Sequence, residues 1–224
     1  MRTNSGRAAP SFMVKESLAA RLRDEILEGR LAPGERVVEG RWAAQFKVAQ
    51  GSIREALNIL AHEGFVQKGH GRSARVTRLS PQDITQICQL RAALESLAAR
   101  LVAETRPDLG ELEQVLADMR AATECNNMRL FYERDLRFHL LLCEKSGNHF
   151  LAQAVRRIIV PLFAFVIMRV HDPQRTPEVW QKSVEEHRHM LVALKTGDPE
   201  FAGCHVAQAI GKFSRDLSSL TGPG

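Results

Sequence analysis

The stretch EGRWAAQFKVAQGSIREALNILAHEG, residues 39–64, decides how the first third of this 224-residue chain folds. EGRWAAQF (39–46) predicts a short helix, and SIREALNILAHEG (52–64) predicts a longer one that ends at Gly64. The apolar side of the longer helix carries Ile53, Ala56, Leu57 and Leu60. Arg54, in its first turn, points away from that side. Two short helices joined by a tight turn, the second presenting a basic side chain, are typical of a DNA-binding helix-turn-helix.

The flanking sequence completes such a unit. Upstream, Leu18, Leu22 and Ile26 recur every fourth residue in a helix that starts at Ser11 and stops at Gly29, before a Pro33-Gly34 turn. Downstream, FVQKGHGRSARVTRL (65–79) reads as a β-hairpin with a glycine tip. Its basic residues are Lys68, His70, Arg72 and Arg75. The order helix, helix, helix, hairpin predicts a winged helix-turn-helix domain over residues 11–79, after a disordered leader over residues 1–10.

Residues 80–224 predict a second, all-helical domain. SPQD (80–83) is a strong helix start, with Ser80 as N-cap and Pro81 in the first helical position. Ile84, Ile87, Leu90, Leu94, Leu97 and Leu101 then form an amphipathic stripe. Further helices are expected at about 108–123, 127–145, 148–170, 176–196 and 198–219, separated by Pro, Gly and Asn. The fold class is therefore mainly α, with a six-helix bundle behind the winged domain.

The composition suits a soluble protein that binds a polyanion. Residues 1–80 hold 14 Lys/Arg and 8 Asp/Glu, whereas residues 81–224 hold 17 and 18. The most apolar run, IIVPLFAFVIM (158–168), is too short for a membrane span and contains Pro161. With no apolar signal core at the N-terminus, we expect a cytoplasmic protein that is not bound to a membrane. The four scattered cysteines read as reduced thiols.

The first domain resembles the N-terminal domain of the GntR superfamily of bacterial transcription regulators. The resemblance covers residues 15–78 and rests on I-x-x-G-x-L-x-P-G-x-x-V, then V-x-x-x-x-I-R-E-A-L-x-x-L-x-x-E-G. It implies that Arg54 and residues 50–52 face DNA and that the His70-Gly71 tip enters a groove. The expected DNA-contacting residues are Arg41, Gln50, Gly51, Ser52, Arg54, His70, Gly71, Arg72 and Arg75.

The recognition segment departs from the family pattern. Where members commonly have VSRTPVREAL, this chain has VAQGSIREAL, so that Gln50 replaces a basic residue. Gln pairs with adenine, which predicts a non-standard operator. Two alternatives stay open: Arg54 could form a surface salt bridge with Glu55 or Glu63, and Arg72 and Arg75 could belong to a merely solvated hairpin.

RDLRFHLLLCEKSGN, residues 134–148, places an acid and an imidazole on an apolar stripe. Asp135 and His139 lie one helical turn apart, in line with Phe131 and Leu142. On later helices, His187 falls inside an apolar stripe and His205 lies at the edge of one. A bound Zn²⁺, Ni²⁺ or Mn²⁺ would satisfy such a group. Asp135 and His139 could instead pair directly, and any one histidine could be a hydrogen-bonded core residue.

The second domain resembles the C-terminal effector-binding (FCD) domain of the FadR-like subfamily. The matching segments are QLRAALESLAARLVAE, DLRFHLLLCEKSGN and SVEEHRHMLVALKTGDPEFA. Metal-binding members use D-x-x-x-H, the His of E-H and a His near the end of the last helix, which implies the ligands Asp135, His139 and His187. The fourth His should fall near Ala209, and His205 lies one turn earlier. The site then has His205 as a displaced ligand, or three protein ligands with water or effector, or no metal.

Two further residues are candidates for binding an effector. Arg91, in the R-x-x-L-E segment, could hold a carboxylate bidentately, or pair with Glu95 at the surface. Asn148 could touch an effector or simply cap a helix. The resemblance implies a homodimeric regulator that binds a palindromic double-stranded operator and responds to a small organic acid. Alternatives are a metal-dependent enzyme that uses the Asp/His cluster and a metal-free regulator that senses an acyl thioester.

Overall fold

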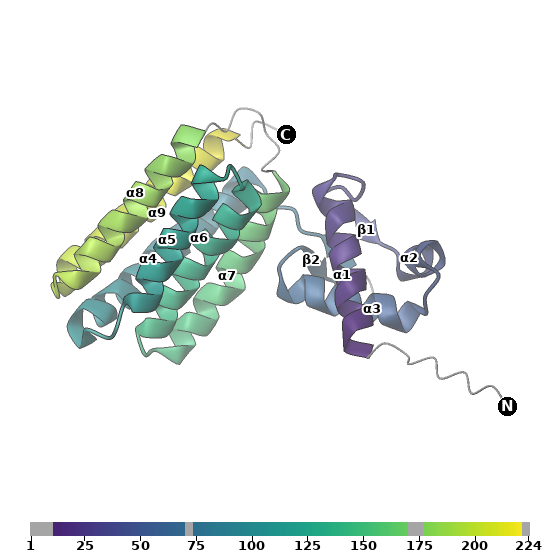
Figure 1. Ribbon diagram of the computed structural model, residues 1–224, viewed down its shortest axis with the longest axis horizontal. Coiled ribbons are helices and arrows are strands. Elements are labelled where there is room, and N and C mark those ends of the chain that lie inside the picture. Colours follow the sequence, from purple (N-terminus) through teal and green to yellow (C-terminus); the bar gives the residue numbers. More distant parts are fainter. Residues whose placement is uncertain (1–10, 70–73, 170–176, 221–224) are drawn as a thin grey trace. The chain divides into compact units, whose positions relative to one another are not determined.

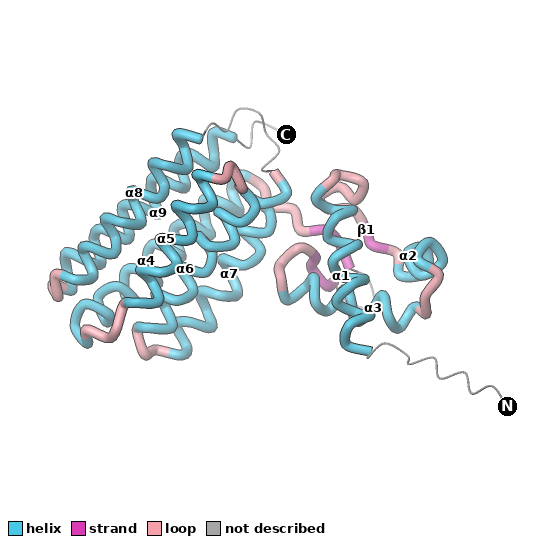
Figure 2. Tube along the Cα trace, in the orientation of Figure 1, coloured by secondary structure: helices cyan, strands magenta, loops and turns pink. Residues whose placement is uncertain are grey.

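The computed structural model describes residues 11–69, 74–169 and 177–220. The chain forms two compact units, Met1–Arg78 and Leu79–Gly224, and each is described by itself. Helices dominate both units, and short strands occur only in the first among the described residues (Figures 1 and 2). The predicted mainly α fold class is confirmed.

The first unit packs three helices against a small sheet. Its elements are α1 (Ser11–Leu27), β1 (Arg36–Val37), α2 (Glu39–Phe46), α3 (Gln50–His62), β2 (Val66–Lys68) and β3 (Ala74–Val76). The strands are antiparallel in the order β1-β3-β2. The predicted hairpin is β2 and β3, and β1 adds a third strand by pairing with β3. The helix predicted at 39–46 is confirmed to the residue, and α3 begins two residues before the predicted start.

The second unit is a bundle of helices. They are α4 (Pro81–Thr105), α5 (Gly110–Glu124), α6 (Met128–Lys145), α7 (His149–Met168), α8 (Pro177–Lys195) and α9 (Pro199–Leu220). The start of α4 is the predicted one: the Ser80 hydroxyl accepts from the backbone N–H of Asp83, whose carboxylate accepts from the Ser80 N–H. α4 packs against α6, α7, α8 and α9, so side chains on its buried side meet those of the other helices inside the bundle.

The buried side of α4 is not its leucine stripe. The buried residues are Ile84, Cys88, Arg91, Glu95, Ala98, Ala99, Val102 and Ala103. Of the predicted stripe only Ile84 is buried, while Leu90 and Leu97 are 48% and 44% exposed. α9 approaches α4 closely at Gly203, which lies against the side chains of Ser96 and Arg100, and the two charged residues on the buried side of α4 point into the bundle instead of into water. Because α4 turns the side with Arg91 and Glu95 inward, both residues become part of the candidate site.

Candidate metal centre and DNA interface

The outer side of α3 presents the candidate recognition residues. Ile53, Ala56, Leu57 and Leu60 are buried, whereas Gln50, Gly51 and Arg54 are exposed and Ser52 is half-buried. The Arg54 guanidinium donates to both carboxylate oxygens of Glu39 on α2, at 3.2 and 2.8 Å. Glu39, and not Glu55 or Glu63, is therefore its partner. The contact fixes the direction of the arginine without removing it from solvent.

The other DNA candidates are spread around this surface. Arg41 is exposed beside the Trp42 ring, 5.8 Å from Cζ to the ring centroid. Arg75, exposed on β3, donates to the Gly34 carbonyl at 3.1 Å. Gln50 lies over Gly40, where an added Cβ would come within 3.0 Å of the Gln50 amide nitrogen. His70, Gly71 and Arg72, the predicted wing tip, lie outside the described residues.

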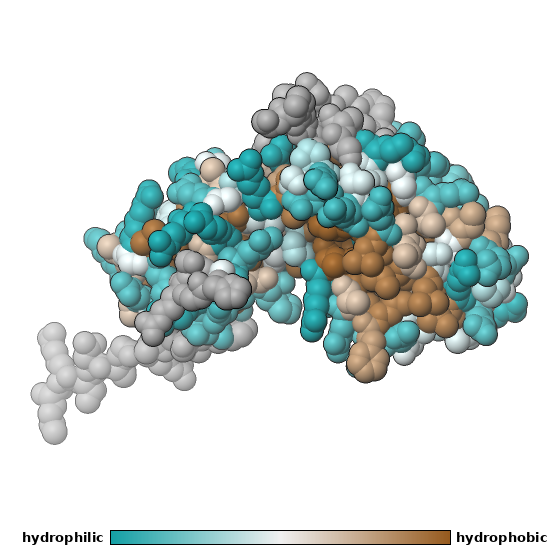
Figure 3. All heavy atoms as spheres, turned by 180° about the vertical axis from the view of Figure 1, so that it is seen from behind, coloured by the Kyte–Doolittle hydropathy of each residue, from teal (hydrophilic) through white to brown (hydrophobic). Residues whose placement is uncertain are grey.

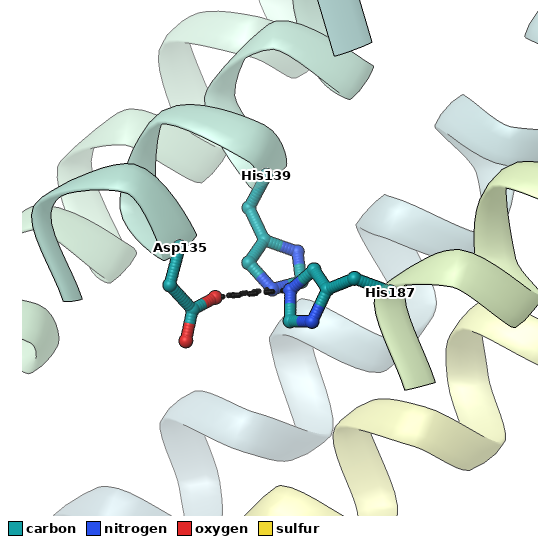
Figure 4. Close-up of side chains that lie close together, drawn as sticks. All are labelled: Asp135, His139 and His187. Atoms are coloured by element: carbon teal, nitrogen blue, oxygen red, sulfur yellow. Dashed lines mark hydrogen bonds and ion pairs between the residues drawn. The ribbon is translucent and has the colours of Figure 1, made fainter. Parts of the chain in front are cut away.

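Inside the second unit, Asp135, His139 and His187 converge (Figure 4). All three side chains are buried, and their candidate ligand atoms lie within 4.8 Å of one another. Asp135 Oδ1 is 3.3 Å from His139 Nε2 and 3.1 Å from His187 Nε2. Helix α6 supplies the first two residues at i and i+4, and α8 supplies the third. The predicted juxtaposition of these three residues is what the structure has.

Both imidazoles have a fixed hydrogen-bonding orientation. His139 Nδ1 is 2.5 Å from Glu95 Oε2, and His187 Nδ1 is 2.7 Å from the Ser183 carbonyl. A carboxylate and a carbonyl oxygen only accept, so each Nδ1 carries the proton. In the neutral rings the lone pair is then on Nε2, the atom that faces Asp135. A carboxylate that orients a metal-binding imidazole in this way is a common feature of metal centres.

The donor set fits a divalent cation. Two atoms each about 2.1 Å from one ion are roughly 3.0–3.4 Å apart in octahedral or tetrahedral geometry, which matches the separations from Asp135 Oδ1 to the two Nε2 atoms. Imidazole nitrogen and carboxylate oxygen together suit Zn²⁺, Ni²⁺ or Mn²⁺. The three residues would leave further coordination positions for water or another ligand.

Arg91 extends the cluster toward α7 and α9. Its Nε donates to Glu95 Oε1 at 2.8 Å, and both side chains are fully buried. The guanidinium lies beside the stacked rings of Phe163 and Phe213, with Cζ 5.3 and 5.4 Å from their centroids, which are 6.2 Å apart. Nη1 is buried and has no hydrogen-bond partner among the described residues. The pair predicted as a surface alternative thus exists, but inside the bundle, and it leaves a donor unsatisfied.

The charges of this network stabilise one another against burial. Burial alone would raise the pKa of Glu95, but Arg91 and His139 lower it to about 2. Burial would likewise raise the pKa of Asp135, which His187 and His139 lower. Burial opposes a proton on His139, yet the Glu95 carboxylate raises the pKa of that ring overall. Without a cation His139 tends to keep its second proton, so acid competes with metal for Nε2.

The remaining two candidates lie apart from this cluster in the described residues. His205 is half-buried and its ring rests on Phe201, with the centroids 4.6 Å apart; it does not belong to the group of three. Asn148 caps α7, its side-chain oxygen accepting from the Leu151 N–H at 3.1 Å, which is the alternative given for it. In the part of the chain that the structure describes, no hydrogen bond joins Asn148 to the cluster.

Glu95 is the site residue that sequence reasoning left at the surface. The i, i+4 spacing from Arg91 identified the pair, but the leucine stripe indicated that the other side of the helix was buried. The contact between Glu95 and His139 joins residues 44 apart in the chain. The single available signal was a charged pair among alanines, R-x-x-x-E followed by Ala98 and Ala99.

Comparison with known proteins identifies both units. Residues 14–76 match the model of the bacterial regulatory proteins, gntR family, and residues 86–211 match the FCD domain. A probable D-xylose utilization operon transcriptional repressor of Paenarthrobacter nicotinovorans is 28% identical over 87% of this chain and 86% of its own length. The Glc operon transcriptional activator of Escherichia coli (strain K12) is 26% identical over 88% and 82%.

A solved structure titled E. coli McbR/YncC has the same fold, with a TM-score of 0.69 and 21% identity over 92% of this chain and 96% of that one. These relatives include a repressor and an activator, so the direction of regulation varies among them. The protein is a transcriptional regulator: it belongs to the GntR family of bacterial regulatory proteins, with an FCD domain as its helical unit.

Proposed function

We propose that the protein is a cytoplasmic, ligand-responsive regulator that binds a palindromic operator as a homodimer. In this proposal α3 enters the major groove, with Gln50 and Arg54 reading base edges and the exposed cations of the first unit contacting phosphates. This proposal is supported by the position of Arg54, which is exposed on the side of α3 opposite the buried residues of that helix and donates hydrogen bonds to Glu39. The wing residues His70, Gly71 and Arg72 stay part of the proposal on sequence grounds alone.

The helical unit would bind a divalent cation through Asp135, His139 and His187. The observation that carries this part is that both Nε2 atoms lie 3.1–3.3 Å from Asp135 Oδ1, while each Nδ1 has its own hydrogen-bond acceptor. Such an arrangement is unsatisfied unless protons or a cation occupy the space between the three groups. A cation there would supply a Lewis-acidic centre for an incoming oxygen ligand.

The effector would be a small carboxylate bound between this centre and Arg91. Arg91 Nη1 is a buried donor without a hydrogen-bond partner among the described residues, and a carboxylate oxygen would satisfy it. The charges agree with a monoanion: a divalent cation and Arg91 bring three positive charges, and Glu95 and Asp135 bring two negative ones. One carboxylate therefore neutralises the site, which makes binding in a buried environment favourable.

The test measures metal content first and DNA affinity second. Elemental analysis of the purified protein should find about one divalent ion per chain, and none in the His139→Ala variant. Fragments selected by the protein from its own genome should then change affinity when small carboxylates are added. Absence of DNA binding even at low ionic strength rejects the proposal as a whole. Binding without metal favours a metal-free sensor, and hydrolysis or isomerisation of the added acids favours an enzyme.

A further inference from the structure

A wall of phenylalanine rings borders the metal centre. The wall, defined here as Phe138, Phe163 and Phe213, comes from α6, α7 and α9. The Phe138 ring meets the His187 ring edge to face, with the centroids 4.9 Å apart, and the centroid of Phe163 is 6.1 Å from that of His139. Phe138 and Phe163 are fully buried, whereas Phe213 is half-buried, so within the wall Phe213 is the ring that reaches solvent.

Phe163 lies against both groups that are proposed to hold the effector. Its ring is beside His139, and its centroid is 5.3 Å from Arg91 Cζ. Phe213 stacks on Phe163, with the two rings 9° from parallel and their centroids 6.2 Å apart. That separation is too small to admit a third ring between them, because each stacked contact needs about 3.5 Å. A molecule that joins the metal centre to Arg91 therefore places its body against the edges or outer faces of these rings.

Few hydrogen-bonding groups remain for the body of the effector. Among the described residues of the helical unit, the buried side-chain atoms without a hydrogen-bond partner are Arg91 Nη1, Arg134 Nε and Trp180 Nε1. The Arg134 side chain is 42% exposed and lies beside Asp118. Trp180 precedes His187 by seven residues, which is about 10.5 Å along α8. A small acid at Arg91 therefore meets one unsatisfied donor, and its carboxylate uses that donor.

These surroundings favour an apolar body over a hydroxylated one. Burying a hydroxyl group without a hydrogen-bond partner weakens binding by roughly 5–100-fold for each group. A cation compensates only for those hydroxyls that coordinate it. An apolar body instead gains from leaving water, and a flat unsaturated body gains further, because edge-to-face and offset-stacked rings attract one another beyond the area that they bury.

We propose that the effector is a monocarboxylate with a flat, apolar body, such as an aromatic or conjugated unsaturated acid, and that the phenylalanine wall binds this body. Arg91 and the cation hold the carboxylate, while Phe163 and Phe213 contact the carbon skeleton. The inference rests on the proposed function and narrows its small organic acid to one chemical class. Polyhydroxy acids fall outside that class, because the wall offers their hydroxyls no hydrogen-bond partner.

The test is isothermal titration calorimetry of the zinc-loaded, full-length protein with three acids. Benzoate has a flat apolar body, cyclohexanecarboxylate has an apolar body of similar size that is not flat, and gluconate has a hydroxylated chain. Benzoate should bind at least about tenfold more tightly than gluconate. It should bind roughly two- to tenfold more tightly than cyclohexanecarboxylate. Gluconate that binds as tightly as benzoate, or more tightly, would overturn the proposed class.

The Phe213→Leu variant tests the wall itself, because Phe213 is half-buried and leucine keeps the position apolar. Its affinity for benzoate should fall roughly two- to tenfold, with cyclohexanecarboxylate within about twofold of wild type. The ratio of these two affinities does not change when a variant merely loses part of its folded population. The matched control is Phe150→Leu, because Phe150 on α7 is 75% exposed. Apolar acids could also adsorb to the outside of this unit, where Figure 3 shows a hydrophobic area, and the control should bind all three acids like wild type.

The outcomes separate this inference from the proposed function. A preference for gluconate, or a Phe213→Leu variant that binds benzoate like wild type, overturns the inference but leaves a carboxylate-responsive regulator. An equal loss of benzoate affinity in Phe150→Leu places the binding on the outer surface and overturns the role of the wall. If none of the three acids binds, the inference alone is overturned when another carboxylate still changes operator affinity, and both are overturned when none does.

Discussion

Replacing Glu95 with glutamine tests how the metal centre is oriented. In the native chain one carboxylate oxygen accepts from Arg91 Nε at 2.8 Å and the other is 2.5 Å from His139 Nδ1. Glutamine has one accepting oxygen and one NH₂ donor. If its oxygen keeps the charged Arg91, its NH₂ faces His139, which must then accept at Nδ1 and carry its proton on Nε2. The proposed ligand atom of His139 loses its lone pair.

Two magnitudes follow from this geometry. Loss of an orienting hydrogen bond of this kind lowers metal affinity roughly 10–100-fold. The pKa of Glu95 in the folded chain, about 2 against 4.5 in its unperturbed state, corresponds to about 3 kcal/mol of stabilisation from its ionised form. The metal-free variant should therefore unfold with a free energy lower by about 3 kcal/mol, the range expected when one partner of a buried ion pair is removed.

The assay is competition for Zn²⁺ with a fluorescent chelator, combined with urea unfolding of metal-free protein. Nitrogen-detected NMR of His139 reports the tautomer directly, which a general loss of stability would not change. Glu133→Gln is the matched control, because Arg129 and Glu133 form the same i, i+4 pair on α6 with both side chains about half exposed. It should cost well under 1 kcal/mol. Zinc affinity of the Glu95 variant within twofold of wild type would refute the reasoning.

Three further predictions concern operator affinity, the pH dependence of stability and the effect of the metal on Tm. Arg54→Ala should weaken operator binding roughly 10–100-fold in fluorescence anisotropy, since a base-contacting arginine is lost, whereas Arg30→Ala, an exposed arginine held by Glu25, should change it less than twofold. The free energy of unfolding of the metal-free protein should fall as the pH drops from 4.5 toward 2, because the folded state keeps Glu95 ionised at pH values where the unfolded state binds a proton; equal denaturation midpoints at the two ends would contradict this. When the free metal concentration is about 100 times the dissociation constant of the site, adding a chelator should lower Tm by roughly 5–10 °C. The His139→Ala variant should show no such change in a thermal melt.

Local signals in the sequence sufficed for most of the fold. The helix at 39–46 and the start of α4 were predictable because they depend on nearby residues: an amphipathic turn in one case, the Ser80–Asp83 capping box in the other. β1 was missed because a two-residue strand is too short to show alternation, and only pairing with β3 defines it.

The site was predictable as far as helical spacing reaches. Asp135 and His139 share a side of α6 by the i, i+4 rule, and His187 followed from its own apolar stripe. Periodicity could not say which side of α4 is covered, because the leucine stripe and the side with Arg91 and Glu95 compete for the bundle interior. The packing of α4 against α9 and the other helices decided it, and these long-range contacts have no local signature.

The central claim is that the buried cluster couples an organic acid to DNA affinity. Its most direct test compares operator binding by the zinc-loaded wild type with operator binding by the His139→Ala variant, which should hold no metal. Each protein is titrated with a panel of small carboxylates. The account predicts that at least one acid shifts the operator affinity of wild type tenfold or more, and that the shift disappears in the variant while its affinity in the absence of acid stays measurable. An equal response of both proteins, or no response of wild type to any acid, would contradict it.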